Sequence, residues 1–152
     1  MSWQSYVDNL MADGTCQDSA IIGYTDAKYV WASVPGGVFV NITSQEIDGV
    51  VGKDREAFFT SGLTLGTKKC SVIRDSLNAE NDWTMDVRTK SVGGEPTYNI
   101  SIGKAGRVLV FVMGKEGVHG AMVFIMGKEG VHGGQLNQKV FSMADHLRKS
   151  GF

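Results

Sequence analysis

Two short stretches place chemically versatile side chains between glycines. The sequence Gly-Lys-Glu-Gly-Val-His-Gly occurs at 114–120 and again at 127–133. A phosphate-binding loop needs a Ser or Thr directly after the lysine and an earlier glycine at a fixed spacing. Here a Glu follows each lysine and no glycine stands at that spacing. We therefore expect neither stretch to bind a nucleotide phosphate.

The remaining catalytic and metal-binding residue types form no recognisable constellation. His119 and His132 are copies of one residue, so their number does not indicate a metal site. The only cysteines, Cys16 and Cys70, are too few for a disulfide scaffold or a zinc module, and they suit free thiols in a reducing compartment. No nucleophile elbow supports a Ser-His-Asp triad. The sequence predicts a protein that is not an enzyme and uses no metal or cofactor.

Aromatic side chains near the two ends of the chain carry more information. Trp3 and Tyr6 are three residues apart, Trp31 lies in an expected strand, and Phe152 follows an expected helix. Segments next to chain ends are usually exposed, so Trp3 and Phe152 would be poorly buried as core residues. An exposed groove of Trp, Tyr and His suits a polyproline II ligand, because rings stack on proline ridges and ring donors reach free carbonyls. The alternative is that these are ordinary core residues.

Helical spacing indicates which elements position these aromatics. Apolar residues recur at helical spacing from Trp3 to Met11, and again from Leu136 through Lys149. Ser2 is a candidate N-cap for the first helix. Thr43 followed by Glu46 forms a capping-box motif, which predicts a short helix that stops near Gly52.

Between the terminal helices the pattern changes to strands. Residues 20–24 and 28–33 read as two strands joined by a turn at 25–27. Four further strands are expected, of which three alternate with period two and the last is an apolar run, at 68–75, 83–88, 98–102 and 108–113. Short turns between neighbouring strands imply an antiparallel meander. The predicted fold is α+β, with a central antiparallel sheet of about six to seven strands flanked on one side by the N- and C-terminal helices.

Length and charge limit the classes of protein that remain. The chain has 152 residues, 42% of them hydrophobic, and a net charge of −1. We expect one soluble, intracellular domain over 1–152, without a signal peptide or a membrane span. The near-zero net charge does not favour nucleic-acid binding.

One internal repeat is abnormal for a finished domain. Residues 110–120 recur at 123–133, an offset of 13, with Val112 replaced by Ile125 as the single difference. The repeat is a duplicated strand-loop segment at 110–134, in which two nearly identical strands compete for one place in the sheet. We favour the first copy there, because the tight turn before it then stays intact. The alternatives are that the second copy enters the sheet or that the extra copy adds an edge strand.

Five motifs in order resemble vertebrate profilin, and together they cover essentially the whole chain except the 13 duplicated residues. They are Trp3–Gly14, Gly52–Arg55, Lys69–Ser76, Met113–Gly120 and His146–Gly151. The resemblance implies a non-catalytic, cofactor-free, cytoplasmic and cytoskeleton-associated regulator of actin filament assembly. Its implied partners are monomeric actin, proline-rich proteins and phosphoinositide headgroups at the membrane surface.

The resemblance also implies three sets of binding residues. The polyproline set is Trp3, Tyr6, Trp31, His146, Leu147 and Phe152. The phosphoinositide set is Lys69, Arg88, Lys90, Arg148 and Lys149. The actin set, in which the lysines and arginines would offer cations to an acidic partner, is Phe59, Thr60, Lys69, Ser71, Val72, Arg74, Arg88, Lys90, Thr97, Asn99, Val118, His119, His132, Asn137, Phe141 and Ser142.

Two further hypotheses follow from the sequence. Because the duplicated Val-His-Gly adjoins the implied actin surface, an extruded copy would obstruct actin while leaving proline-rich binding intact. The competing class is a small-molecule sensor domain, which would have a similar sheet and a buried pocket lined by Trp83, Met85, Tyr98 and Ile100.

Overall fold

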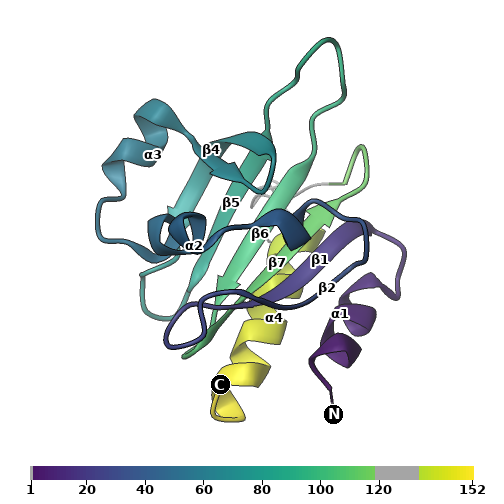
Figure 1. Cartoon of the computed structure of the whole chain (residues 1–152). Coiled ribbons are helices and arrows are strands. Elements are labelled where there is room, and N and C mark those ends of the chain that lie inside the picture. The colour runs from purple at the N-terminus through teal and green to yellow at the C-terminus, as the bar shows by residue number, and fades with distance from the viewer. Residues whose placement is uncertain (1, 119–133) are drawn as a thin grey trace, which may run out of the picture.

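Seven antiparallel strands form one sheet in the order β2-β1-β7-β6-β5-β4-β3 (Figure 1). The computed structural model describes residues 2–118 and 134–152. The strands from β3 to β7 follow one another as a meander, and β1 pairs with β7 to extend the sheet to β2. The bounds are β1 Cys16–Gly23, β2 Val30–Ser33, β3 Leu63–Leu65, β4 Lys68–Ser76, β5 Thr84–Thr89, β6 Asn99–Lys104 and β7 Val108–Gly114.

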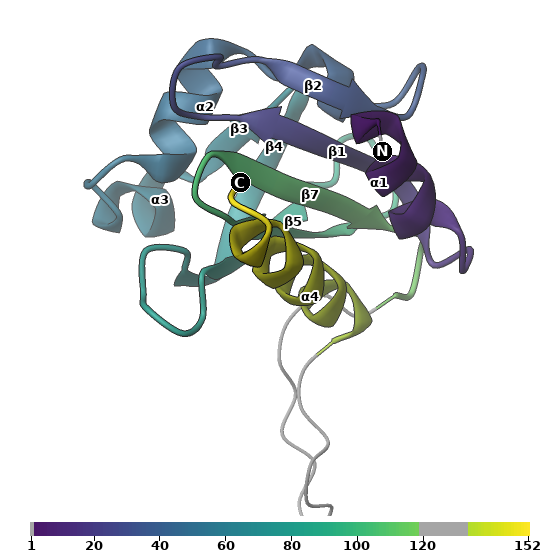
Figure 2. The ribbon, with the colours of Figure 1, turned by 90° about the horizontal axis from the view of Figure 1, so that it is seen from below.

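The terminal helices lie on the same face of this sheet. Helix α1 (Trp3–Met11) packs on β1 and β2, and α4 (Gln135–Lys149) lies across β5, β6 and β7 (Figure 2). The remaining helical segments are the 3-10 turn η1 (Phe39–Asn41), α2 (Ser44–Val51) and α3 (Glu56–Ser61). The α+β fold class and the placement of the terminal helices on one side are confirmed.

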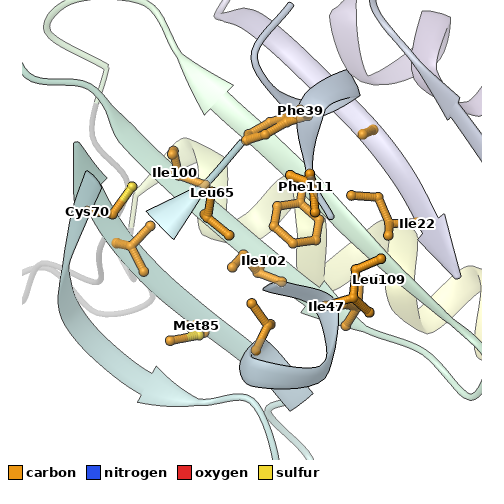
Figure 3. Close-up of a cluster of buried hydrophobic side chains, with 14 of the residues drawn as sticks. Ile22, Phe39, Ile47, Leu65, Cys70, Met85, Ile100, Ile102, Leu109 and Phe111 are labelled. Atoms are coloured by element: carbon orange, nitrogen blue, oxygen red, sulfur yellow. The ribbon is translucent and has the colours of Figure 1, made fainter. Parts of the chain in front are cut away.

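The sheet separates two hydrophobic clusters. On the face away from the terminal helices, Phe39 meets Phe111 with ring centres 5.3 Å apart, and Ile47 of α2 belongs to the same buried cluster (Figure 3). On the other face, Leu10 of α1 and Val140 of α4 belong to a second buried cluster. Burying one such side chain fully stabilises the fold by about 1.5–3 kcal/mol.

Strand β7 lies in the middle of the sheet and contributes side chains to both clusters. All seven of its residues are buried, and Phe111 faces the first cluster while Val110 and Val112 face the second. A strand covered on both faces reads as a continuous apolar run, which is why 108–113 shows no polar alternation. Gly103 of β6 lets α4 approach, since a Cβ there would lie 2.5 Å from the Val140 carbonyl oxygen.

Local sequence signals account for some element boundaries and not others. The Thr43–Glu46 capping box is present, with Thr43 N–H donating to Glu46 Oε1 at 2.9 Å and Glu46 N–H donating to Thr43 Oγ1 at 3.2 Å. Ser2 occupies the N-cap position of α1, but its side chain makes no capping bond. The sequence reading also missed α3 and the three-residue strand β3.

The strand that pairs with both β1 and β6 comes from the first copy of the duplication. It is Val108–Gly114, which follows directly on the turn after β6. The strand residues of the second copy, 123–126, lie outside the described residues.

None of the helices in the described ranges combines the length and the apolar character needed to cross a lipid bilayer.

Candidate functional site

Four aromatic rings and one histidine gather where α1, β2 and the end of the chain meet. The Trp3 ring centre lies 5.5 Å from that of Tyr6, 5.0 Å from that of Trp31 and 4.8 Å from that of Phe152. The Tyr6 and His146 ring centres are 6.2 Å apart. We call Trp3, Tyr6, Trp31, His146 and Phe152 the aromatic cluster. It joins residues that are up to 149 positions apart in the sequence (152 − 3).

Backbone contacts hold these rings in position. Trp31 Nε1 donates to the Ala27 carbonyl at 3.1 Å, and a Cβ on the neighbouring Gly23 would lie 2.5 Å from that Nε1. The chain turns back after α4 at Gly151, whose φ of +95° lies in the left-handed region that favours glycine. The Phe152 N–H then donates to the Leu147 carbonyl at 2.8 Å, which places the Phe152 ring against Trp3.

The cluster is open to solvent on one side. Trp3, Tyr6, Trp31 and Phe152 are half-buried, and His146 is exposed. Leu147 differs from the sequence-based expectation, because its side chain is fully buried in the cluster beneath the helices. It therefore supports the aromatic cluster from below instead of facing a ligand.

A groove of about 610 Å³ continues from the aromatic cluster between α1 and α4. Tyr6 and His146 belong to its lining, together with residues that the sequence reading did not single out, namely Ser5, Asn9, Leu10, Asp13, Gln138, Lys139, Ser142 and Met143. Helical spacing could have found most of them, since residues 6, 9 and 10 share one face of α1 and residues 139, 143 and 146 share one face of α4.

Lys139 ties the two walls of this groove together. Its Nζ donates to the Leu10 carbonyl at 2.7 Å and to Asp13 Oδ1 at 2.6 Å. The Lys139 hydrogen bond is the main cause that lowers the pKa of Asp13 to about 2, with further donors from Thr15. The ion pair between Lys139 and Asp13 therefore lies in the groove, at the end away from the aromatic cluster.

A second surface lies on β4, β5 and β6, toward the other edge of the sheet. Ser71 is opposite Arg88, Lys90 N–H donates to the Lys69 carbonyl at 2.8 Å, and Arg88 Nε donates to Asn99 Oδ1 at 2.9 Å. Lys69, Arg88 and Lys90 are exposed. The structure therefore brings together five residues of the set that the profilin resemblance implies for actin, namely Lys69, Ser71, Arg88, Lys90 and Asn99.

The neighbouring Arg74 is already paired with carboxylates of this chain, whereas the resemblance implied that it would offer its charge to an acidic partner. Arg74 Nε donates to Asp86 Oδ2 at 2.9 Å, and its Nη1 donates to Asp82 Oδ2 at 3.0 Å. Asn137, at the start of α4, also donates to Asp86 Oδ2 at 3.1 Å and is itself buried. Burial raises the pKa of Asp86, although Ser101 and Arg74 donate to it. Arg74 therefore joins β4 to β5, and Asn137 joins α4 to β5.

The other residues that the resemblance implies for actin lie around the surface on β4, β5 and β6, with one exception. Phe59 of α3 and Phe141 of α4 are exposed by 60% and 40%, and Ser142, Thr60 and Thr97 are also exposed. Val72 instead packs against the cluster on the opposite face. The Val118 carbonyl accepts from Asn99 Nδ2 at 2.8 Å, whereas His119 and His132 lie outside the described residues.

The phosphoinositide set divides into two places. Lys69, Arg88 and Lys90 lie together on β4 and β5. Arg148 lies beside Trp83 at the far end of β5, with its Cζ 5.1 Å from the ring centre. Lys149 Nζ pairs with Asp145 Oδ2 at 2.9 Å on the surface of α4.

The described part of the chain holds no cluster of metal-ligating side chains. Within 2–118 and 134–152, no set of three His, Cys, Asp or Glu side chains could hold a metal ion. Burial raises the pKa of the Cys16 thiol, and raises that of Cys70 to about 12, so both stay protonated and unreactive at neutral pH. Met85 and Ile100, named for a sensor pocket, are fully buried among packed hydrophobic side chains instead.

Comparison with known proteins agrees with this geometry. The family model described as profilin matches residues 1–152. The chain belongs to the profilin family.

Its relatives include vertebrate members of that family. Human profilin-2 is 67% identical over 150 residues, which cover 99% of this chain and 98% of the relative. Human profilin-1 is 54% identical over the same length and coverage. Mouse profilin IIa, solved in complex with a double repeat from the FH1 domain of mDia1, is 66% identical with a TM-score of 0.89, and both chains are covered completely.

More distant profilins share the fold. Profilin IB from Acanthamoeba castellanii is 20% identical, covers 99% of this chain and 100% of its own, and gives a TM-score of 0.67.

Proposed function

We propose that this chain binds proline-rich segments through the aromatic cluster and monomeric actin through the surface on β4, β5 and β6, and that it thereby regulates actin filament assembly. The observation that carries the proposal is the gathering of Trp3, Tyr6, Trp31 and Phe152 into one half-exposed cluster. The vertebrate profilins supply the precedent, since one relative was solved with an FH1 repeat. The chain acts as a non-catalytic adaptor in the cytoplasm.

The physical argument for a proline-rich ligand rests on shape and on hydrogen bonding. A polyproline II helix is preformed, so it loses little conformational entropy on binding, and its carbonyls have no internal partners. The tilted and edge-on rings around Trp3 leave faces for proline rings. The groove beyond Tyr6 and His146 gives the flanking residues of such a ligand a place to lie.

Trp3 is the centre of the cluster, and replacing it tests this proposal. Trp3→Ala removes the ring that contacts three others, so we expect the affinity for a ten-residue polyproline peptide to fall at least tenfold in calorimetric titration. Trp83→Ala is the matched control, because Trp83 is a half-buried tryptophan that does not belong to the aromatic cluster. If Trp3→Ala binds the peptide as tightly as the unsubstituted chain does, the aromatic cluster is not the binding site.

The proposed actin surface combines exposed cations with exposed aromatic rings. Lys69, Arg88 and Lys90 would meet acidic groups of the partner, while Phe59 and Phe141 supply apolar area. Arg74 would act indirectly, because its guanidinium is already paired with Asp82 and Asp86.

The duplication adjoins this surface through the covalent chain. Strand β7 ends at Gly114 and α4 begins at Gln135, so the added residues are inserted directly before Asn137 and Phe141. His119 and His132 cannot both occupy the single position that the family uses. We therefore expect actin binding to be weakened, whereas the aromatic cluster is built from other parts of the chain.

Phosphoinositide binding is the third proposed activity. Lys69, Arg88 and Lys90 form a compact group of exposed cations that could meet an anionic headgroup. Because the chain has a net charge of −1, such binding should be local and sensitive to salt.

A further inference from the structure

The loop between β5 and β6 projects beyond the end of the sheet (Figure 1). Every residue from 90 to 97 in this loop is exposed. Gly93 and Gly94 form its tip, with φ values of +64° and +84° in the left-handed region, and a Cβ on either glycine would meet nothing within 4 Å. The tip of the loop is therefore open to an enzyme that acts on the surface of the protein.

The Ser91 hydroxyl closes this loop. Ser91 Oγ donates to the Glu95 carbonyl at 2.7 Å, and the Glu95 N–H donates to the Val92 carbonyl at 3.4 Å. Two other hydrogen bonds hold the base of the loop: the Thr89 N–H donates to the Tyr98 carbonyl at 2.9 Å, and the Tyr98 N–H donates to Thr89 Oγ1 at 2.8 Å. Because the base is held independently of Ser91, the loop can open without separating β5 from β6.

Two cations precede Ser91 in the sequence. Arg88 stands three residues before it and Lys90 one residue before it, and both are exposed. An arginine three residues before a serine or threonine occurs at no other place in the chain. No carboxylate of the described residues forms an ion pair with Arg88 or Lys90. Protein kinases select their substrates by charge patterns of this kind, and an arginine suits acidic pockets because its guanidinium can bind a carboxylate with two parallel hydrogen bonds.

Other hydroxyl groups near cations lie in regular secondary structure. Ser71 and Ser142 follow a lysine at the same distance, but Ser71 lies within β4 and Ser142 within α4. Thr89, next to Lys90, is the last residue of β5 and is only 4% exposed. Entry of such a residue into a kinase active site would break backbone hydrogen bonds of the strand or helix. Ser91 needs only to give up its own hydrogen bond within the loop.

We propose that Ser91 is a phosphorylation site for an arginine-directed protein kinase, and that phosphorylation weakens the binding of monomeric actin. In the reaction the Ser91 Oγ forms a bond to the γ-phosphorus of ATP, the bond from that phosphorus to the bridging oxygen of the ADP leaving group breaks, and the hydroxyl proton passes to the catalytic base of the kinase. The effect on actin rests on the proposed function, because Lys90 and Thr97, at the two ends of the loop, belong to the residues proposed for actin.

A phosphate on Ser91 would change both the loop and the charge of the surface. The ester oxygen has no hydrogen to donate to the Glu95 carbonyl, and the phosphate carries close to two negative charges at neutral pH. Those charges would repel the Glu95 carboxylate, which lies 3.7 Å from Lys68 Nζ. The loop would then open, and the phosphate would compensate the charge of Lys90. An acidic partner would therefore meet a weaker positive potential on this surface.

The modification is tested by incubating the full chain with ATP and a purified calmodulin-dependent protein kinase that selects arginine three residues before the acceptor. We expect mass spectrometry to locate phosphate on Ser91, Ser91→Ala to lose it, and Arg88→Gln to lower kcat/KM for this reaction about tenfold. Ser44→Ala, which removes an exposed serine elsewhere, is the matched control and should be phosphorylated on Ser91 at the unchanged rate. No phosphate on Ser91, or an equal rate for Arg88→Gln, overturns the inference.

The effect on function is tested by titrating the unmodified and the phosphorylated chain with monomeric actin. We expect phosphorylation to weaken actin binding about tenfold, by an amount that shrinks as salt is added, and to leave the affinity for a polyproline peptide unchanged. Equal actin affinities of the two forms overturn the inference while the proposed actin binding stands. If the unmodified chain binds no actin but Ser91 is phosphorylated in an Arg88-dependent way, the modification site stands and the proposed actin binding falls.

Discussion

Asp18 is the clearest case of a residue whose role depends entirely on the folded structure. It lies in β1 with 2% of its surface exposed, and its Oδ2 accepts hydrogen bonds from the N–H groups of Val38 at 2.7 Å and Phe39 at 2.9 Å. Within the described part of the chain its Oδ1 is buried without a partner. A Cβ on Gly37 would lie 2.4 Å from that oxygen, so glycine is needed there. Burial raises the pKa of Asp18.

This raised pKa predicts a specific dependence of stability on pH. The folded state holds the Asp18 proton more tightly than the unfolded state, so its contribution is fully present below the ordinary pKa of about 3.9 and is lost as pH rises through the raised pKa. We expect urea denaturation to show that Asp18→Asn removes this loss of unfolding free energy between pH 4 and neutral pH. Asp54→Asn, which alters an exposed carboxylate, serves as the control. Parallel pH profiles for the unsubstituted chain and Asp18→Asn would refute the role of burial.

Sequence reasoning found part of the candidate site at the scale of single residues. The spacing of Trp3 and Tyr6 predicted a shared helix face, and the structure has both rings in one cluster. The sequence could not show that Leu147 lies beneath that cluster or that Arg74 is paired with Asp86, because both facts depend on which strands and helices meet.

At the scale of elements, the sequence predicted a helix start correctly where neighbouring side chains accept hydrogen bonds from the helix's free backbone N–H groups. The Thr43–Glu46 capping box is such a case, because both bonds lie within four residues of sequence. By contrast, α3 has no buried residues, and Arg55 before it is held by Asp75 of β4. Strand β3 spans three residues, and among the described strands it pairs with β4 alone. Neither α3 nor β3 carries a periodic pattern long enough to be recognised.

The capping box gives a prediction at this scale. Thr43→Ala removes the side-chain acceptor for the Glu46 N–H, so we expect the unfolding free energy to fall by about 1 kcal/mol in urea denaturation. Ser44→Ala, one residue further on and already helical, is the matched control and should change stability by a few tenths of a kcal/mol. Equal stability of Thr43→Ala and Ser44→Ala would mean that packing alone sets the start of α2.

At the scale of the whole molecule, the antiparallel meander could be predicted from the sequence, but the pairing of β1 with β7 could not. Strands β4 to β7 follow each other through connections short enough to imply neighbouring pairs. The pairing of β1 with β7 joins residues about ninety positions apart, from Ile21 and Val110 (110 − 21). That pairing separates the aromatic cluster, near β2 at one edge, from the cations on β4 and β5 near the other.

This separation underlies the central claim, that one chain carries a proline-rich site and an actin surface that can be changed independently. The duplicated segment is inserted next to only one of them. Deleting 110–122 joins Leu109 directly to Val123 and restores a single copy, in which Ile125 takes the place of Val112.

The most direct test titrates the full chain and the variant lacking 110–122 with monomeric actin and, in parallel, with a polyproline peptide. We expect equal affinities for the peptide and at least tenfold tighter actin binding by the deletion variant. Equal actin affinities would contradict the obstruction of the actin surface, and a change in peptide affinity would contradict the independence of the two sites.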